Sequence, residues 1–248
     1  MEYYRFVLYP FFGILPSIVW LCYYLQKDLH PEPKKMIVKV FLWGSVITIP
    51  VFFIQIGLSE LLGSLQALTF FKYYPIAVDI IKWFLIIALT EELLKYVIVR
   101  ISALKSYALD EPLDAMLYMV VAALGFAAVE NILYLFSPIG LMSFDAILEA
   151  TIWITVIRFI GATFLHTLCS ATLGYFVAMS FFDTKKRLQL TMIGILAATL
   201  LHGLYDFSIM TLHAPFVYVI PIVIIIELAV FVISAFDKVK KMKSVSKM

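Results

Sequence analysis

Seven long runs of apolar residues, separated by short polar segments, follow one another along the sequence. Each run is close to the ~20 residues that an α-helix needs to cross the hydrocarbon core of a bilayer. The runs lie at 5–25, 36–58, 79–101, 113–136, 151–181, 190–211 and 216–236. This pattern predicts an all-α fold, a polytopic transmembrane helix bundle of about seven spans.

The composition supports a membrane protein and excludes an ordinary soluble domain. Of the 248 residues, 63% are hydrophobic and only 15% are charged. A soluble core of this length could not bury so many apolar side chains, whereas a lipid bilayer solvates them. The net charge of +2 does not favour nucleic acid as a partner. We expect residues 1–248 to form a single membrane-embedded domain, with a basic tail at 236–248.

Lys and Arg between the predicted spans are unevenly distributed, and the positive-inside rule places the basic segments in the cytoplasm. The turns after the first, third, fifth and seventh spans carry Lys27, Lys34, Lys35, Lys39, Arg100, Lys105, Lys185, Lys186, Arg187, Lys238, Lys240, Lys241, Lys243 and Lys247. The opposite side carries Arg5, Lys72 and Lys82. We therefore expect the N-terminus outside and the C-terminus in the cytoplasm.

Ionisable residues lie within the predicted spans, where lipid would be their alternative environment. A charge near the bilayer centre costs about 2.5–3.5 kcal/mol on the insertion scale, so such groups face a protein interior or a water-filled cavity. The residues are Glu91, Glu92, Lys95, Glu130, Arg158, His166, His202, Asp206 and Glu227. Most have similar depths in their helices, which suggests one shared site; Glu227 stands alone and is left outside it.

The third span contains two adjacent carboxylates and a lysine, in the segment Thr-Glu-Glu-Leu-Leu-Lys at 90–95. Glu91 and Lys95 are four residues apart and can pair on one helical face. Glu92 points about 100° away from Glu91, so the two carboxylates have different roles. One can be held ionised by Lys95 while the other faces a cavity and acts as a general base, although a purely structural ion pair is the alternative.

Three further spans supply polar groups. Glu130 and Asn131 follow Phe126 in the fourth span, where Gly125 and neighbouring alanines allow close helix packing. In the fifth span Arg158 and His166 lie two turns apart, and in the sixth His202 and Asp206 form an i, i+4 pair. An interhelical hydrogen bond at Glu130 and a structural role for His166 are the simpler alternatives.

In combination, these motifs resemble the PrsW family of intramembrane proteases, which is related to CAAX prenyl proteases and bacteriocin-processing enzymes. The order is His30-Pro31-Glu32-Pro33, Glu91-Glu92-x-x-Lys95, Glu111-Pro112-x-Asp114, Gly125-Phe126-Ala127 to Glu130-Asn131, His166, and His202-x-x-x-Asp206. In the CAAX-protease relatives, a His usually replaces Glu130 and an Asn usually replaces Asp206. Roles at those two positions therefore do not transfer directly.

The resemblance implies a multi-pass protease of the bacterial plasma membrane. Its implied substrate is a single-span membrane protein, such as an anti-sigma factor, which is cut at site 1 on the outer side of the membrane during envelope stress. We expect Glu91 or Glu92 to activate a water molecule, and His202 with His166 to stabilise the oxyanion. Glu130 and Asp206 would orient water or imidazole. Lys95, Asn131, Arg158 and Phe126 would support the site.

Two other functions fit parts of this pattern. A zinc-dependent metalloprotease could use Glu130, His166, His202 and Asp206 as ligands, although the sequence lacks a His-Glu-x-x-His helix. The sequence therefore favours the glutamate-type enzyme without a cofactor over the zinc enzyme. A proton-coupled transporter could also use intramembrane acids and histidines, but no inverted repeat is evident.

Overall fold

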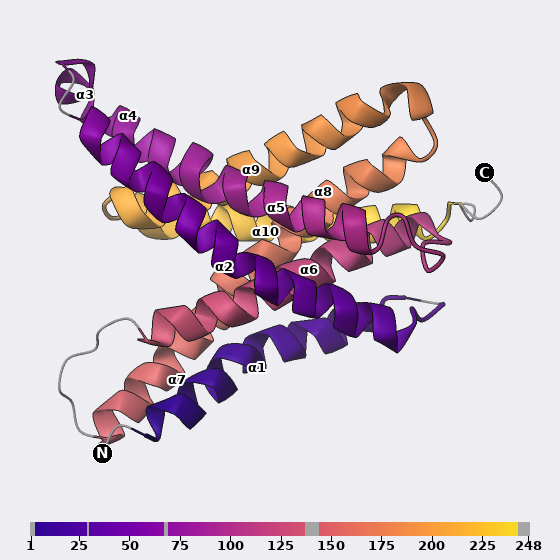
Figure 1. The fold of residues 1–248 in the computed structure, drawn as a ribbon, viewed down its shortest axis with the longest axis horizontal. Helices are drawn as coiled ribbons and strands as arrows, with labels where there is room; N and C mark the ends of the chain where they lie inside the picture. Colours follow the sequence, from indigo (N-terminus) through magenta and orange to yellow (C-terminus); the bar gives the residue numbers. More distant parts are fainter. Residues whose placement is uncertain (1–2, 29, 67–68, 137–143, 243–248) are drawn as a thin grey trace.

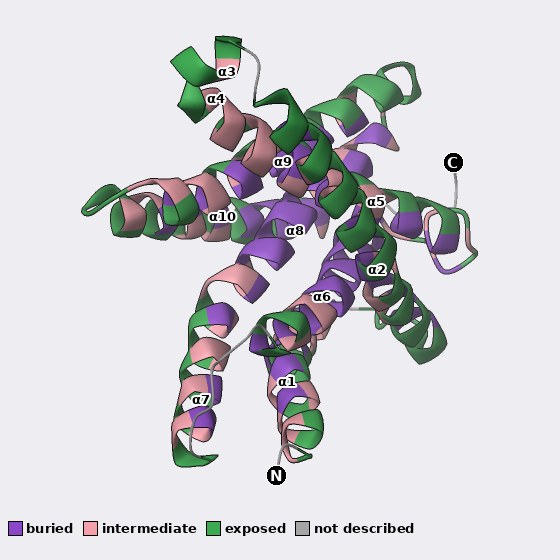
Figure 2. Cartoon of the chain, turned by 60° about the vertical axis from the view of Figure 1, so that its left-hand side comes forward, coloured by how far each residue is buried: buried purple, intermediate pink, exposed green. Residues whose placement is uncertain are grey.

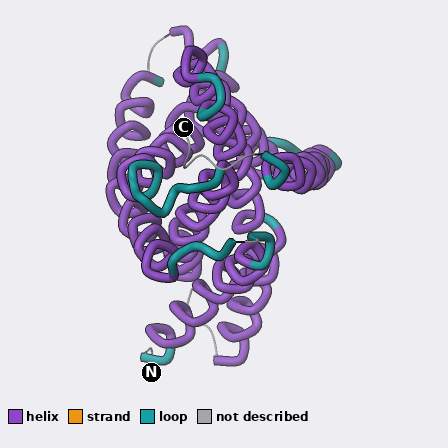
Figure 3. Tube along the Cα trace, turned by 90° about the vertical axis from the view of Figure 1, so that its right-hand side faces the viewer, coloured by secondary structure: helices purple, strands orange, loops and turns teal. Residues whose placement is uncertain are grey.

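The structure is a computed structural model, and it describes residues 3–28, 30–66, 69–136 and 144–242. This part of the chain is helical, with short connecting loops, and contains no strand (Figures 1 and 3). The helices are α1 (Arg5–Leu25), α2 (Lys34–Leu65), α3 (Thr69–Tyr73), α4 (Pro75–Ile80), η1 (Ile81–Ala88), α5 (Leu89–Ser102), α6 (Pro112–Phe136), α7 (Phe144–Ile160), α8 (Ala162–Ser180), η2 (Thr184–Lys186), α9 (Arg187–Thr211) and α10 (Phe216–Val239). The all-α prediction is confirmed.

Among the described residues, six helical stretches are long and apolar enough to cross a membrane, which confirms six of the seven predicted spans. The seventh, 79–101, is also helical, through α4, η1 and α5. It runs between the two ends of the bundle beside α2 and α9 (Figure 1). Its charged residues, among them Glu91, Glu92 and Lys95, make it more polar than those six stretches, and these three belong to the predicted site.

Two predicted boundaries differ from the structure because hydropathy follows the lipid boundary, whereas helical hydrogen bonding continues beyond it. α2 extends past the predicted end at 58 to Leu65. The predicted run 151–181 begins earlier, at Phe144, and is broken at Gly161 into α7 and α8. A Cβ at Gly161 would lie 2.6 Å from the Tyr205 hydroxyl of α9 and 2.9 Å from the Ile157 carbonyl, so the break provides room for this approach.

α6 forms the centre of the bundle and contacts α1, α2 and α8 extensively. All its residues from Pro112 to Ala128 are buried, whereas the outer helices carry many exposed residues (Figure 2). Many of these exposed residues are large and apolar, as contact with lipid requires. Close packing of α2 on α6 depends on glycine. A Cβ at Gly125 would collide with the Phe41 carbonyl, and one at Gly44 with Ala122. The predicted small-residue contact at Gly125 is therefore confirmed.

The turns after α1, α5 and α8 lie at one end of the bundle with the C-terminal end of α10 (Figure 1). These are the segments rich in Lys and Arg, so the sequence-based grouping of basic turns agrees with the arrangement in space. Which end faces the cytoplasm stays a prediction. α10 continues to Val239, so the expected tail begins after that residue and not at 236. Part of that tail, 243–248, lies outside the described residues.

Candidate active site

The acidic pair of α5 lies inside the bundle, directly after the π-helical segment η1. Glu91, Glu92 and Lys95 are 3%, 0% and 0% exposed. Lys95 Nζ lies 2.9 Å from Glu92 Oε1 and 3.4 Å from Glu91 Oε2. The expected Glu91–Lys95 pair is therefore present, but the closer ion pair is formed by Glu92. π-Helical turns often occur at functional sites, and this one sets the position of the acidic pair.

A cavity of about 670 Å³ borders Glu91 and is lined by residues of α2, η1, and α5 to α9. The predicted site residues in its wall are Glu91, Phe126, Glu130, Arg158, His166, His202 and Asp206. Glu92 and Lys95 do not line it. The two adjacent carboxylates thus occupy different environments, as their angular separation on the helix predicts.

His166 of α8 lies between two carboxylates. Its Nε2 lies 2.9 Å from Glu130 Oε2, while its Nδ1 lies 3.9 Å from Glu91 Oε2 and 2.9 Å from Lys95 Nζ. Because a carboxylate only accepts hydrogen bonds, the contact with Glu130 favours the tautomer with the proton on Nε2. The lone pair on Nδ1 then points toward Lys95 and Glu91.

His202 of α9 has a corresponding arrangement. Its Nδ1 lies 3.0 Å from Glu92 Oε1, and its Nε2 lies 4.0 Å from Glu91 Oε2 and 3.4 Å from Asp206 Oδ2. With Nδ1–H donated to Glu92, Nε2 faces the carboxylates of Asp206 and Glu91, of which Asp206 is the nearer. The rings of His166 and His202 are perpendicular, with centroids 5.0 Å apart. Two imidazoles from separate helices therefore direct one nitrogen each at the same carboxylate oxygen.

The group formed by Glu91, His166 and His202 has the chemistry of a metal site. Its ligand atoms all lie within 4.8 Å of one another, and all three residues are buried. Two histidines and one glutamate are a donor set of catalytic zinc, which leaves a fourth position for water. Ligating imidazoles usually donate their second N–H to a carboxylate, as Glu130 and Glu92 allow here. Zinc binds such ligands at about 2.0–2.2 Å, so the three side chains would have to move closer together to hold one ion.

Glu130 is held by more than His166. Arg158 Nη2 donates to Glu130 Oε2 at 2.7 Å, and Arg158 Nε donates to Asn131 Oδ1 at 2.5 Å. The Asn131 amide nitrogen donates to the Gly13 carbonyl of α1 and to Thr163 Oγ1 of α8. These bonds join four helices around Glu130. Of the expected ligand alternatives, Glu130 and Asp206 border the donor group formed by Glu91 and the two histidines and do not belong to it.

Phe126 contributes an aromatic face. The ammonium of Lys95 lies 4.4 Å from the centre of its ring, and its ring centroid lies 5.6 Å from that of His166. A cation over an aromatic face is stabilised without a counter-charge, which helps to keep Lys95 ionised inside the bundle.

The sequence reasoning missed two groups that contact the acidic pair. Gln55 Nε2 of α2 donates to Glu91 Oε1 at 3.1 Å, and Ser170 Oγ of α8 donates to Glu92 Oε2 at 3.0 Å. Gln55 had a recognisable signal, an amide in the middle of an apolar run. The contact of Ser170 with Glu92 had no such signal, because it depends on how α8 packs on α5.

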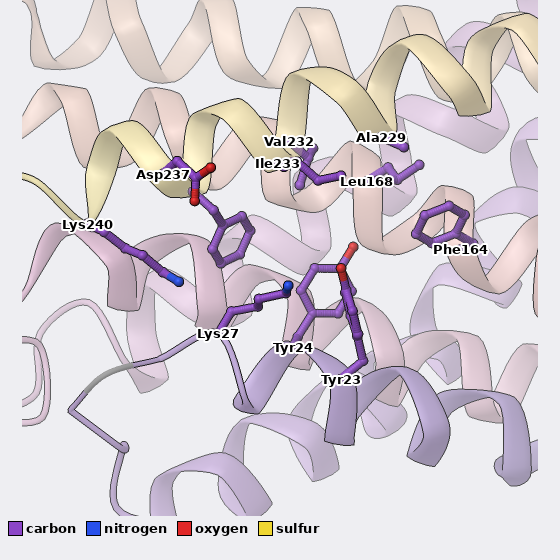
Figure 4. Close-up of a pocket in the computed structure, with 11 residues that line it drawn as sticks. Tyr23, Tyr24, Lys27, Phe164, Leu168, Ala229, Val232, Ile233, Asp237 and Lys240 are labelled. Atoms are coloured by element: carbon purple, nitrogen blue, oxygen red, sulfur yellow. The ribbon is translucent and has the colours of Figure 1, made fainter.

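A second, smaller pocket of about 60 Å³ lies between α1, α8 and α10 (Figure 4). Lys27, Asp237 and Lys240 border it at the basic end of the bundle, and the rest of its wall is aromatic and aliphatic. It contains none of the predicted site residues. Glu227, which was left outside the site, is exposed on α10 and lines neither pocket.

A multi-pass helical bundle that buries carboxylates and imidazoles beside a cavity has the architecture of an intramembrane hydrolase. The comparison with protein families specifies this class. The model of the PrsW family intramembrane metalloproteases matches residues 32–233. This chain therefore belongs to that family and is a multi-pass intramembrane protease that acts on membrane proteins.

Curated relatives agree over most of the chain. Protease PrsW of Bacillus subtilis is 30% identical over 214 residues, which cover 86% of this chain and 87% of the relative. Protease PrsW of Geobacillus kaustophilus is 28% identical over 199 residues, covering 80% and 78%, and that of Clostridioides difficile is 27% identical over 201 residues, covering 80% and 77%. No solved structure matches the chain.

Family membership confirms the resemblance drawn from the motifs and leaves the transporter alternative without support. It reverses the expected order of the two proteolytic mechanisms, because the family is described as a metalloprotease family. The carboxylate that faces the cavity, Glu91, also faces a nitrogen of each buried histidine. This convergence of three helices could not be read from spacing within any one of them.

Proposed function

We propose that this protein is a zinc-dependent intramembrane peptidase in which Glu91, His166 and His202 hold the metal. The observation that carries the proposal is the pair of imidazoles that direct one nitrogen each at Glu91 Oε2, with distances of 3.9 and 4.0 Å. Each outward N–H of these imidazoles faces a second carboxylate. Bound zinc would supply Lewis acidity, which lowers the pKa of water and polarises a peptide carbonyl.

The neighbouring residues have distinct tasks in this proposal. Glu130 and Glu92 fix the tautomers of His166 and His202. Asp206, whose Oδ2 lies 3.4 Å from His202 Nε2 in the cavity wall, accepts a proton from the attacking water and returns it to the leaving amine. Arg158 keeps Glu130 ionised and oriented through its 2.7 Å contact. Lys95 balances the two carboxylates of α5.

One observation favours the glutamate-type mechanism as a second candidate. Lys95 Nζ lies 2.9 Å from His166 Nδ1, so the ammonium already uses the lone pair that a metal would need. In that mechanism Glu91 removes the proton from water, and His202 donates to the oxyanion. The two candidates use the same residues and differ in whether stoichiometric metal is required.

The substrate that we propose is a single-span membrane protein, such as an anti-sigma factor, cut on the outer side of the bacterial plasma membrane. The cavity lies in the half of the bundle away from the basic turns, because its wall includes Trp83 near the start of η1 and Met210 near the end of α9. If the basic turns are cytoplasmic, this half lies toward the outer leaflet. Apolar residues make up most of the wall, which suits the apolar side chains of a transmembrane segment.

The test combines metal content with proteolysis in lipid nanodiscs. Wild-type protein is expected to carry one zinc per chain, to cleave a tagged single-span substrate, and to lose both zinc and activity to a chelator. His166→Ala and His202→Ala should lower zinc content and cleavage together. His213→Ala is the matched control, since this histidine is exposed in the loop between α9 and α10. Cleavage by zinc-free protein that resists a chelator would refute the zinc mechanism and favour the glutamate-type mechanism.

A further inference from the structure

The pocket of about 60 Å³ between α1, α8 and α10 is charged at one end and apolar along the rest of its wall (Figure 4). We call it the basic pocket, because Lys27 and Lys240 border it together with Asp237. Lys27 lies two residues after the end of α1, and Lys240 directly follows α10. In Figure 4 both lysine side chains extend into the space between these two helices. The basic pocket shares no residue with the catalytic cavity.

The charges of the basic pocket are not balanced within the protein. Within the described ranges neither lysine forms an ion pair, and Lys27 Nζ lies 4.8 Å from the centre of the Tyr23 ring. Asp237 is the one carboxylate in the described wall. Two lysines and one aspartate leave one excess positive charge. A ligand with one net negative charge would balance it.

The wall changes from charged to apolar over the depth of one leaflet. Ala229, at the apolar end of the wall, lies eleven residues before Lys240, which is about 16 Å along a helix. Half of the hydrocarbon core of a bilayer is about 15 Å thick. The wall therefore matches a phospholipid, whose headgroup lies at the end of the helices and whose acyl chain extends inward from there.

The basic pocket opens at the outside of the bundle. Tyr23 and Ile233 in its wall are 39% and 56% exposed, whereas Leu168 and Val232 are 1% and 2% exposed. The exposed pair lies where the bilayer contacts the protein, and the buried pair forms the inner wall. A lipid can thus enter directly from the bilayer, and part of its acyl chain can occupy the space between the helices.

Peptide occupants fit the charge of the basic pocket poorly. Residues 243–248 of this chain contain Lys243 and Lys247 and no acidic residue, so the lysines of the pocket repel them. On the side that the positive-inside rule makes cytoplasmic, the flank of a membrane-protein substrate is also rich in Lys and Arg. An anionic lipid has the opposite sign and an acyl chain for the apolar wall.

We propose that the basic pocket binds one anionic phospholipid, such as phosphatidylglycerol, from the leaflet at the basic end of the bundle. Lys27 and Lys240 donate to its phosphate, and Asp237 accepts from a hydroxyl of its headgroup. One acyl chain lies between α1 and α10. Phe164 of α8 lines the basic pocket and His166 lines the catalytic cavity, so the lipid supports the helix that carries this histidine.

Native mass spectrometry of the full-length protein in detergent counts the lipids that remain bound during a titration. Wild-type protein is expected to bind one phosphatidylglycerol about tenfold more tightly than phosphatidylcholine with the same acyl chains, which has no net charge. The double variant Lys27→Gln, Lys240→Gln should bind phosphatidylglycerol about tenfold more weakly or worse, since each lysine contributes a factor of about five. The matched control is Lys34→Gln, Lys35→Gln, which removes two exposed lysines outside both pockets and should bind like wild type.

Ala229→Phe tests the apolar wall without a change of charge. The larger side chain would occupy the space of the acyl chain and weaken binding, whereas Val230→Phe, at an exposed position outside the pocket, should leave binding unchanged. Equal affinity of wild-type protein for the two lipids would overturn the proposal, because it would indicate only general solvation by lipid. Unchanged phosphatidylglycerol binding in the Lys27→Gln, Lys240→Gln variant would overturn it as well. Because lipid binding is measured without proteolysis, a failure of the proposed zinc chemistry leaves this result unaffected.

Discussion

Isosteric replacement of each adjacent glutamate of α5 should separate chemistry from stability. Glu91→Gln and Glu92→Gln each remove one negative charge and keep the size of the side chain. In Glu91→Gln, the ammonium of Lys95 keeps its 2.9 Å partner, Glu92. In Glu92→Gln, Lys95 loses that partner and keeps the 3.4 Å contact with Glu91. We expect the first change to abolish cleavage and the second to destabilise the fold.

The magnitudes follow from burial and contacts. Glu92 and Lys95 are both 0% exposed, and removal of one member of a buried ion pair costs about 3–5 kcal/mol. For a chain of this size, that corresponds to a fall in melting temperature of about 6–20 °C. Glu92 also accepts from Ser170 and His202, which places the loss toward the upper part of that range. Glu91→Gln should lower the cleavage rate by about 10³-fold or more, since Gln can neither bind zinc strongly nor accept a proton.

The assay measures initial cleavage rates in proteoliposomes and, separately, melting temperatures in detergent by intrinsic fluorescence. Glu227→Gln serves as the matched control, because Glu227 is exposed on α10 and lines neither pocket. A Glu91→Gln protein that cleaves within threefold of wild type would refute the assigned chemistry. A Glu92→Gln protein that melts with wild type would refute the assigned ion pair.

Three further predictions concern residues around this site. Gln55→Met should lower kcat by about tenfold with little change in melting temperature, because it removes the amide that orients Glu91; substrate-saturated rates measure this effect. Arg158→Lys should lower the activity and should lower the free energy of unfolding by about 1–3 kcal/mol, because lysine cannot donate to Glu130 and Asn131 at the same time. Denaturant titration in detergent measures the stability change. Gly125→Val should lower the melting temperature more than Gly57→Val, since a Cβ at Gly125 meets α2 whereas one at Gly57 meets nothing within 4 Å.

Sequence patterns predicted the helical fold and several residues that line the cavity. Both follow from free-energy costs, because apolar side chains are unfavourable in water and charged side chains are unfavourable in lipid. Hydropathy identified six spans that the structure confirms. Charge inside an apolar run then selected Glu91, His166 and His202, which converge on one cavity. Each of these inferences needs only the residue type and its depth in a helix.

Pairing between helices was not accessible in the same way. Spacing within α5 suggested that Lys95 pairs with Glu91, yet the closer partner is Glu92, whose carboxylate also receives His202 from α9. Similarly, Glu130 was expected among the alternative zinc ligands, but Arg158 and His166 both bind its Oε2. Rotation of one helix against another decides these contacts, and a single sequence contains no direct record of that rotation.

Charge balance ties the site to its proposed metal. Among the described residues of the site are four carboxylates, Glu91, Glu92, Glu130 and Asp206, and two permanent cations, Lys95 and Arg158. With both histidines neutral, the group carries two excess negative charges inside an apolar bundle, where such an imbalance is costly. Either two protons on the histidines or one divalent cation between them removes the excess. The glutamate-type enzyme would carry the two protons and the zinc enzyme the divalent cation, so the zinc content of the purified protein distinguishes the two ways of balancing the charge.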